Sequence, residues 1–361
     1  MAKTARLARP LHPGAWWLWA LGLAVAASRT TNPLLLVMVM VVVAQVVAVR
    51  RGEAPWSRGF KAYVWLALIV IGIRVAYRML LDGQYGDHIL FTLPEIPLPD
   101  RIQGIRLGGP VSAEGMLAAL YDGLRLATLL LCVGAANVLA DPKRLLKAMP
   151  GALHEAGVAV TVALTMAPQL VESAHRVRRA RKLRHESRRR LALVRTVLVP
   201  VLMDALDRSL LLAAAMDSRG YGRTNNVARG QRFVTSSLVL GGLVALCAGT
   251  YGLLDESTPR WLGVPMLLLG SVGAWAGLAL GGRRVRTTRY RPDPWLRAEW
   301  AVALTGAVVA VVVVAVSMSD PLALAGQLQP LQWPTLPLLP AIGVALGVVP
   351  ALDRSDRGWA R

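Results

Sequence analysis

Two aspartates, Asp204 and Asp207, form the pattern in this chain that comes closest to a catalytic motif. A D-x-x-D pair could hold Mg²⁺ against a diphosphate, which is the chemistry of a membrane prenyltransferase. Residues at positions i and i+3 share one helix face, and Arg208 lies directly beside them. Because no second aspartate cluster accompanies the pair, local ion pairing along a helix is the favoured interpretation.

Other catalytic and metal-binding patterns are missing from the sequence. No Gly-Lys dipeptide of a Walker A loop occurs, so nucleotide would have to be handled by a partner, and no Gly-x-Ser-x-Gly motif marks a hydrolase nucleophile. The 5 histidines show no metal-ligand spacing, and His154-Glu155 lacks the second histidine of H-E-x-x-H. The 2 cysteines, Cys132 and Cys247, lie inside apolar runs, which excludes a disulfide framework and a cysteine-based metal site. We therefore expect no catalytic residue, metal site or cofactor on this chain.

The elements that could position functional side chains lie between residues 139 and 233, where two long stretches have a helical pattern but are too polar for ordinary membrane spans. In the first stretch, apolar residues recur in alternating steps of four and three, which places them along one helix face. The stripe ends where a run of arginines begins. The stripe comprises Leu153, Gly157, Val160, Leu164, Ala167, Val171 and Ala174, and the arginines are Arg176, Arg178, Arg179, Arg181 and Arg184.

The second stretch repeats this design and then closes on a glycine-containing segment. Gly220 and Gly222 are predicted to terminate the helix, which leaves Arg219 projecting from its end. The apolar face comprises Leu191, Val194, Leu198, Val201 and Ala205, and the closing segment is Met216-Asp217-Ser218-Arg219-Gly220-Tyr221-Gly222.

A proline lies inside each stretch, Pro168 in the first and Pro200 in the second. Such a proline removes a backbone hydrogen bond and bends the helix axis. At about 1.5 Å per residue each helix could run about 40 Å. Two bent amphipathic helices with basic tips would make a docking platform for another protein. A pair of interfacial helices lying on anionic lipid explains the same pattern equally well.

The rest of the chain is predicted to be a polytopic membrane protein. Hydrophobic residues make up 55% of the chain and charged residues 17%, and the mean hydropathy is +0.47. The apolar blocks approach the ~20 residues that a helix needs to cross a bilayer. The N-terminal block also imitates a secretory signal, but Trp16, Trp17 and Trp19 at its front favour a retained first span. The predicted spans are 15–28, 33–49, 62–81, 115–138, 234–254, 262–280, 300–318 and 336–350.

The placement of the charges explains the formal net charge of +20. Lys and Arg gather in both terminal tails and in the 50–61 and 281–299 loops, whereas the 82–114 and 319–335 loops contain few or none. This positive-inside pattern predicts a multi-pass protein of the inner (cytoplasmic) membrane, with both termini and the 139–233 stretch in the cytoplasm. Since no aromatic interleaving or reader motif accompanies the arginines, nucleic acid is not an expected partner.

We predict an all-α fold in three parts. Residues 1–138 would form about four spans, residues 139–233 a cytoplasmic domain with the two amphipathic helices, and residues 234–361 three to four further spans with a cytoplasmic tail. The 82–114 loop is the exception, because its prolines exclude a regular helix and predict a short extended or re-entrant segment. These prolines are Pro94, Pro97, Pro99 and Pro110.

The segment 213–222 is the most specific of several that resemble a known family. It is accompanied by Asn32-Pro33, by residues 123–127 (Gly-Leu-Arg-Leu-Ala), by residues 140–146 (Ala-Asp-Pro-Lys-Arg-Leu-Leu) and by the Pro168 helix. Together these segments resemble the transmembrane T component of energy-coupling factor (ECF) ABC transporters, the CbiQ/EcfT family. The resemblance runs from about residue 10 to 230.

The resemblance implies a membrane scaffold with no catalytic activity of its own. In this family two cytoplasmic coupling helices each end in an Ala-Arg-Gly-like motif, whose arginine contacts an ABC ATPase subunit. Ser218 replaces the alanine of the second motif, and Lys182 stands where the first motif has glycine, which leaves Arg179 or Arg184 as substitutes there. The coupling residues that the resemblance implies are Arg179, Ala180, Arg181, Ser218, Arg219, Gly220, Tyr221 and Gly222.

The implied partners are two ABC ATPase subunits, which would bind ATP and Mg, and a small membrane S component for a vitamin or a metal ion such as cobalt or nickel. Two other hypotheses stay open at this point. One is a membrane-embedded transferase that uses Asp204 and Asp207. The other is a secondary transporter, for which we would expect internal repeats that this sequence does not show.

Overall fold

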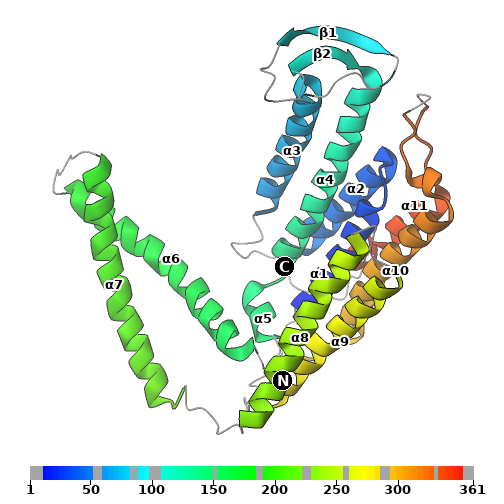
Figure 1. The fold of residues 1–361 in the computed structure, drawn as a ribbon. Helices are drawn as coiled ribbons and strands as arrows, with labels where there is room; N and C mark the ends of the chain where they lie inside the picture. Colours follow the sequence, from blue (N-terminus) through cyan, green and yellow to red (C-terminus); the bar gives the residue numbers. More distant parts are fainter. Residues whose placement is uncertain are drawn as a thin grey trace, which may run out of the picture. The chain divides into compact units, whose positions relative to one another are not determined.

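The computed structural model describes residues 11–51, 59–81, 86, 88–96, 107–148, 153–183, 190–221, 229–254, 260–284, 293–328 and 332–352 (Figure 1). Its described elements are helices apart from one two-stranded β-hairpin, so the all-α prediction is confirmed. The chain divides into two compact units. The first unit combines Met1–Leu145 with Pro292–Arg361, and the second is Leu146–Arg291.

The first unit is built from both ends of the chain. Its elements are α1 (Pro13–Ser28), α2 (Pro33–Arg50), α3 (Phe60–Leu81), β1 (Ile89–Ile96), β2 (Leu107–Ser112), α4 (Ala113–Leu139), α10 (Arg297–Ser319), the 3₁₀ helix η3 (Pro321–Leu324), α11 (Leu338–Leu346) and α12 (Val349–Leu352), with the short α5 (Pro142–Lys147) at its border with the second unit. The antiparallel β-hairpin pairs Ile89 with Ser112 and Leu93 with Gly109. It confirms the extended segment that the prolines of the 82–114 loop predict.

Helix starts in this unit follow from local side-chain chemistry. Asn32 accepts a hydrogen bond from the backbone nitrogen of Leu34 at 3.0 Å, and Pro33 occupies the first turn of α2. His12 and Pro13 play the same two roles for α1. The backbone N–H groups in the first turn of a helix have no acceptor within the helix. The side chain before the helix accepts from one of them, and proline has no N–H group that needs an acceptor.

The core of the first unit forms where α1 crosses α10. A Cβ atom added at Gly306 would lie 2.5 Å from the Cα atom of Trp19, so the two backbones touch. Trp19 and Leu23 of α1 and Val309 of α10 are fully buried around this crossing. Small residues permit this close approach between helices in a membrane, where van der Waals packing drives association.

The end of η3 and the segment that follows it are joined to the turn between α1 and α2. The carbonyl of Leu324 accepts from the Thr30 hydroxyl at 2.8 Å and from the backbone nitrogens of Thr31 and Asn32 at 3.0 and 3.1 Å. The Asn32 amide also donates to the Thr335 carbonyl at 2.7 Å. These bonds satisfy backbone groups of the two connecting segments that regular α-helices would otherwise pair.

Seven helices of the described part of the chain are long and apolar enough to cross a membrane, as judged by length and composition. Six of them match predicted spans, and the seventh lies in α6, which the sequence analysis places outside the membrane. The seven candidates are Pro33–Arg50, Phe60–Leu80, Ala113–Leu139, Ala156–Ala180, Phe233–Leu253, Gly263–Gly282 and Arg297–Ser319.

One of the eight predicted spans differs from the structure. The first predicted span, 15–28, lies within α1, whose 16 residues are fewer than the ~20 of an ordinary span. The predicted span 336–350 was wrong as a single helix, because it is divided into α11 and α12 by a turn at residues 347–348. Gly347 ends α11, and Pro350 cannot donate the backbone hydrogen bond that a continuous helix needs.

The second unit contains four long helices: α6 (His154–Leu183), α7 (Arg190–Ser218), α8 (Arg229–Leu254) and α9 (Arg260–Arg284). Helices α8 and α9 form a hairpin with backbones in contact, since a Cβ atom added at Gly242 would lie 2.5 Å from the backbone nitrogen of Ala274. Helices α6 and α7 form another hairpin, and it is this pair that contains the residues singled out from the sequence (Figure 1).

Candidate functional site

Helices α6 and α7 pack against each other in antiparallel fashion. Ser173 of α6 contacts Asp204 of α7, and Gln169, one turn earlier on α6, contacts Arg208, one turn later on α7. This reversed order of contacts means that the C-terminal ends of the two helices lie at opposite ends of the hairpin. The arginine-bearing segments at those ends are therefore separated by nearly the length of a helix.

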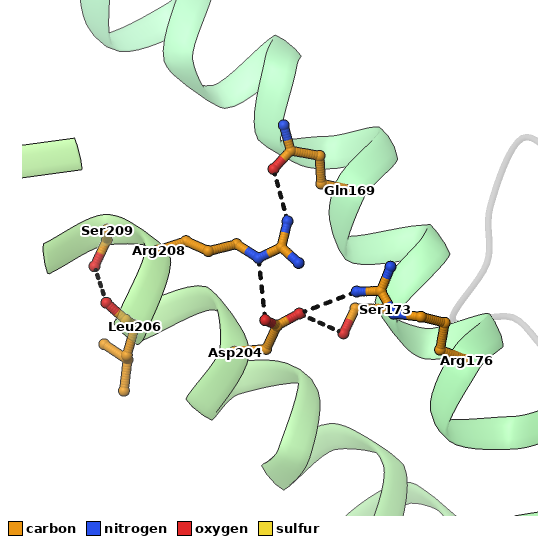
Figure 2. Close-up of polar contacts among 7 residues, drawn as sticks. All are labelled: Gln169, Ser173, Arg176, Asp204, Leu206, Arg208 and Ser209. Carbon is orange, nitrogen blue, oxygen red and sulfur yellow. Dashed lines mark hydrogen bonds and ion pairs between the residues drawn. The ribbon is translucent and has the colours of Figure 1, made fainter. Parts of the chain in front are cut away.

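A polar cluster joins the two helices and is called here the Asp204 clamp: Asp204 and Arg208 of α7 with Gln169, Ser173 and Arg176 of α6 (Figure 2). One oxygen of Asp204, Oδ2, accepts from the Ser173 hydroxyl at 2.7 Å and from Arg176 at 3.4 Å. The other, Oδ1, accepts from Arg208 Nε at 3.0 Å. Arg208 in turn donates to Gln169 Oε1 at 3.0 Å, so both members of the ion pair reach across to α6.

The surroundings of Asp204 favour its charged form. The hydrogen bonds from Ser173 and Arg208 lower the pKa of its carboxyl group below the ordinary value, and the positive charges of Arg208 and Arg176 act in the same direction. Partial burial opposes them, because it raises the pKa of a carboxyl group. The side chain is 35% exposed, and the lowered pKa means that it is ionised at neutral pH.

An apolar groove of about 670 Å³ lies between the same two helices and ends at the Asp204 clamp. Three of its polar members, Gln169, Asp204 and Arg208, belong to the clamp, Ser209 follows them on α7, and Tyr221 lines the groove beyond the end of α7. The rest of the lining is almost wholly apolar. From α6 it includes Val158, Val162, Met166 and Leu170, and from α7 Ala205, Leu212, Ala213 and Met216.

The C-terminal end of α7 forms a Schellman turn. Gly220 has a φ of 72°. The backbone nitrogen of Tyr221 donates to the Met216 carbonyl at 3.0 Å, and that of Gly220 donates to the Asp217 carbonyl at 2.8 Å. This pair of bonds, with glycine in the left-handed conformation, is the standard way to end a helix, so the prediction for Gly220 is confirmed. Gly222, the other predicted terminator, lies outside the described residues.

The turn separates two side chains of the predicted motif. Arg219 is exposed, and the neighbouring Ser218 is also exposed. Tyr221 is also 41% exposed, but it lines the groove together with Met216, which is the hydrophobic pair that commonly accompanies a Schellman turn. The end of α7 thus presents a cation outward and an aromatic ring to the groove.

Helix α6 continues through Lys182 to Leu183, the last described residue before 190, which accords with the absence of glycine at position 182. Arg179 donates to the carbonyl of His175 in the preceding turn at 3.4 Å, and Ala180 is exposed. The side chain of Arg181 and all of Arg184 lie outside the described part of the chain.

Sequence analysis missed the side of the clamp that lies on α6. Gln169, Ser173 and Arg176 follow one another in steps of four and three, which is the spacing of a polar line along a helix face. That spacing is a signal that could have been found. The prolines Pro168 and Pro200 lie inside α6 and α7, as the sequence indicates.

The D-x-x-D pattern does not act as one unit in the structure. Both oxygens of Asp204 are engaged by side chains, and the pairing with Arg208 is the local ion pair that the sequence favours. Asp207 is exposed. Within the described ranges, no three His, Cys, Asp or Glu side chains lie close enough together to hold a metal ion.

A comparison with known protein families gives a match that includes the α6–α7 hairpin. The family model described as CbiQ, cobalt transport protein, matches residues 5–228. The chain belongs to the CbiQ family. Proteins of this family are the T component of ECF transporters, which is a transport subunit. The matched residues include α1 to α4 and the whole α6–α7 hairpin, whereas α8 to α12 follow the match. No curated protein matches the chain.

Proposed function

We propose that this CbiQ-family chain is the coupling scaffold of an ECF-type ABC importer, which links ATP hydrolysis by two partner ATPases to movement of a substrate-binding S component. The cargo is a vitamin or a metal ion. One observation carries the proposal: the antiparallel α6–α7 hairpin has an arginine-bearing helix end at each extremity. This arrangement suits two separate ATPase subunits, one at each end.

The dimensions and chemistry of the hairpin support this role. Helix α7 has 29 residues, which at about 1.5 Å per residue is about 40 Å. Arginine is permanently charged and offers a rigid fork of donors, so Arg219 and Arg181 can bind carboxylates in a groove of each ATPase. A helix held at such a contact transmits the opening and closing of the ATPases as a lever.

The apolar helices of the chain have their own role in this function. The apolar helices hold the S component in the lipid bilayer of the inner membrane, and both termini and the α6–α7 hairpin face the cytoplasm. ATP and Mg are bound by the ATPase subunits, and this chain contributes no cofactor. Positive charges between the predicted spans support that orientation.

Co-purification tests the proposal. The complex is extracted in detergent with a tag on this chain, and Arg181→Glu and Arg219→Glu are compared with the unmodified protein. We expect each reversal to reduce recovery of ATPase subunits, because like charge would face the acidic partner. The double reversal should release them.

Arg178→Glu is the matched control, since Arg178 is an exposed arginine of α6 outside the predicted motif. It should leave ATPase recovery unchanged, and all variants should reach the membrane. Full ATPase recovery together with full uptake by the Arg219→Glu variant would contradict the proposal.

A further inference from the structure

We infer that Asp204 is a positioning residue for coupling: the Asp204 clamp is the fulcrum of the α6–α7 hairpin, through which a load applied at Arg219 changes the width of the apolar groove. This inference rests on the proposed function, because it assigns the load to an ATPase. It concerns the side chains that join the two helices and not the residues that touch the partner.

The position of Asp204 along α7 suits a fulcrum. Helix α7 spans Arg190–Ser218, so 14 residues separate Asp204 from each end (204 − 190 and 218 − 204). Each arm is therefore about 21 Å long at about 1.5 Å per residue. Pro200 lies on the N-terminal arm, whereas the arm from Asp204 to Ser218 contains no proline, so a displacement of Arg219 turns this arm as one body about Asp204.

The clamp and the groove differ in how they resist movement. Hydrogen bonds and ion pairs are directional and weaken steeply when distance or angle changes. The clamp has such contacts at Ser173, at Arg176 and between Arg208 and Gln169. The groove walls beyond it are apolar and include Met166 and Met216, whose flexible side chains accommodate changes in spacing. Movement is therefore concentrated in the groove and restrained at the clamp.

A continuous path connects the groove to the exposed tip. Arg219 is followed by Gly220, whose left-handed conformation reverses the chain direction. Tyr221 then lies against the groove and is hydrogen-bonded through its backbone to Met216. A pull on Arg219 is transmitted by this turn to two groove-lining residues, and α7 pivots about Asp204.

Asp207 is the matched control residue for the proposed role of Asp204. It is the same residue type on the same helix, three positions further along, and it is exposed. A general need for negative charge on α7 would affect both aspartates. A fulcrum requires only Asp204.

The test uses the full chain, assembled with its ATPases in nanodiscs, with Cys132 and Cys247 replaced and nitroxide labels on Ala156 and Ala214. Both label positions are exposed, one near the start of α6 and the other near the end of α7. Electron–electron distance measurements should give a narrow distribution for the parent protein. We expect Asp204→Asn to broaden it at least about twofold and Ser173→Ala to broaden it less, because that variant keeps the ion pair. Asp207→Asn should leave the width unchanged.

The same variants, reconstituted with the ATPases and the S component in sealed proteoliposomes, are assayed for uptake per ATP hydrolysed. Asp204→Asn should lower this ratio by at least about fivefold, the lower end of ordinary allosteric coupling, while ATPase recovery stays at the parent level. Asp207→Asn should keep the parent ratio. An unchanged ratio or an unchanged distance distribution in the Asp204→Asn complex overturns the inference, as does an equal effect of Asp207→Asn.

The two proposals fail in different ways. If the parent chain retains no ATPase on purification, the proposed function is wrong, and no ATPase acts at Arg219 to move α7 about Asp204. If the parent complex assembles and transports, and Asp204→Asn leaves transport per ATP unchanged, only the fulcrum is overturned.

Discussion

Asp204 and Asp207 show how partners, and not residue type, decide what a side chain does. The first faces α6 and accepts hydrogen bonds from Ser173, Arg176 and Arg208, whereas the second is exposed. An isolated exposed ion pair contributes little to stability. The Asp204 clamp is a network that crosses between helices, so losing its central carboxylate leaves several donors without their acceptor.

The lowered pKa of Asp204 predicts how the clamp responds to pH. Because the folded-state pKa lies below the ordinary value of about 3.9, the ionised clamp stabilises the hairpin above that value. This contribution is lost as pH falls through the folded-state pKa. We expect the melting temperature of the parent protein to exceed that of Asp204→Asn by a constant margin from about pH 5 to 8 and the two to converge below about pH 4. A margin that grows on acidification would contradict this assignment.

A second residue-scale prediction concerns Gly220. An alanine there must adopt a φ of 72°, which costs an L-residue about 1 kcal/mol. We expect Gly220→Ala to speed hydrogen exchange at the amides of Gly220 and Tyr221, which donate the two bonds of the Schellman turn. Gly241→Ala is the control, since Gly241 lies inside α8 and a Cβ atom there meets nothing within 4 Å. Equal protection in both variants would argue against the turn.

At the scale of elements, the sequence predicts where helices form better than it predicts which helices pack against one another. The periodic stripes predict α6 and α7, and Asn32-Pro33 predicts the start of α2, because caps and amphipathic faces are local properties. The contact between Gly22 and Gly306 could not be predicted, since helices that are apolar all round do not indicate which face meets which partner. Asp204 was assigned to its own helix for a different reason: the i and i+4 pairing with Arg208 is local, whereas its partners Ser173 and Arg176 are 31 and 28 residues away in the chain.

The crossing of α1 and α10 gives a prediction at this scale. A Cβ atom at Gly306 would lie 2.5 Å from the Cα atom of Trp19, so one backbone must move. We expect Gly306→Ala to destabilise the first unit by about 1–3 kcal/mol, the usual cost of overpacking. Thermal unfolding in detergent measures this loss.

Gly72→Ala is its control, because Gly72 lies in the candidate span of α3 and a Cβ atom there meets nothing within 4 Å. This variant should unfold at the parent temperature or above it. Comparable losses in the two variants would show that the crossing is not tightly packed.

The whole molecule is organised as one unit inserted into another. Residues of the second unit, Leu146–Arg291, separate the two chain segments that form the first. The family match ends at residue 228, yet α10 packs on α1, and the Trp19 indole donates to the Gly347 carbonyl at 3.1 Å. The C-terminal helices are therefore part of the core of the first unit.

Truncation tests this organisation. A chain ending at residue 291 lacks α10 and leaves Trp19, Leu23 and Ala20 of α1 without their partner. We expect it to give little monodisperse protein in detergent by size-exclusion chromatography. Co-expression of residues 292–361 as a separate polypeptide should restore the peak. A well-behaved truncated chain would mean that α10 is dispensable.

The discontinuous first unit also affects biosynthesis. Helix α1 is made before the other helices described here, but the helix that covers its Trp19 face is made only after both hairpins of the second unit have been translated. For most of synthesis, this aromatic face must be shielded by lipid or by the insertion machinery. Membrane integration of this protein therefore cannot be completed span by span in chain order, and α1 is among the last helices to reach its final packing.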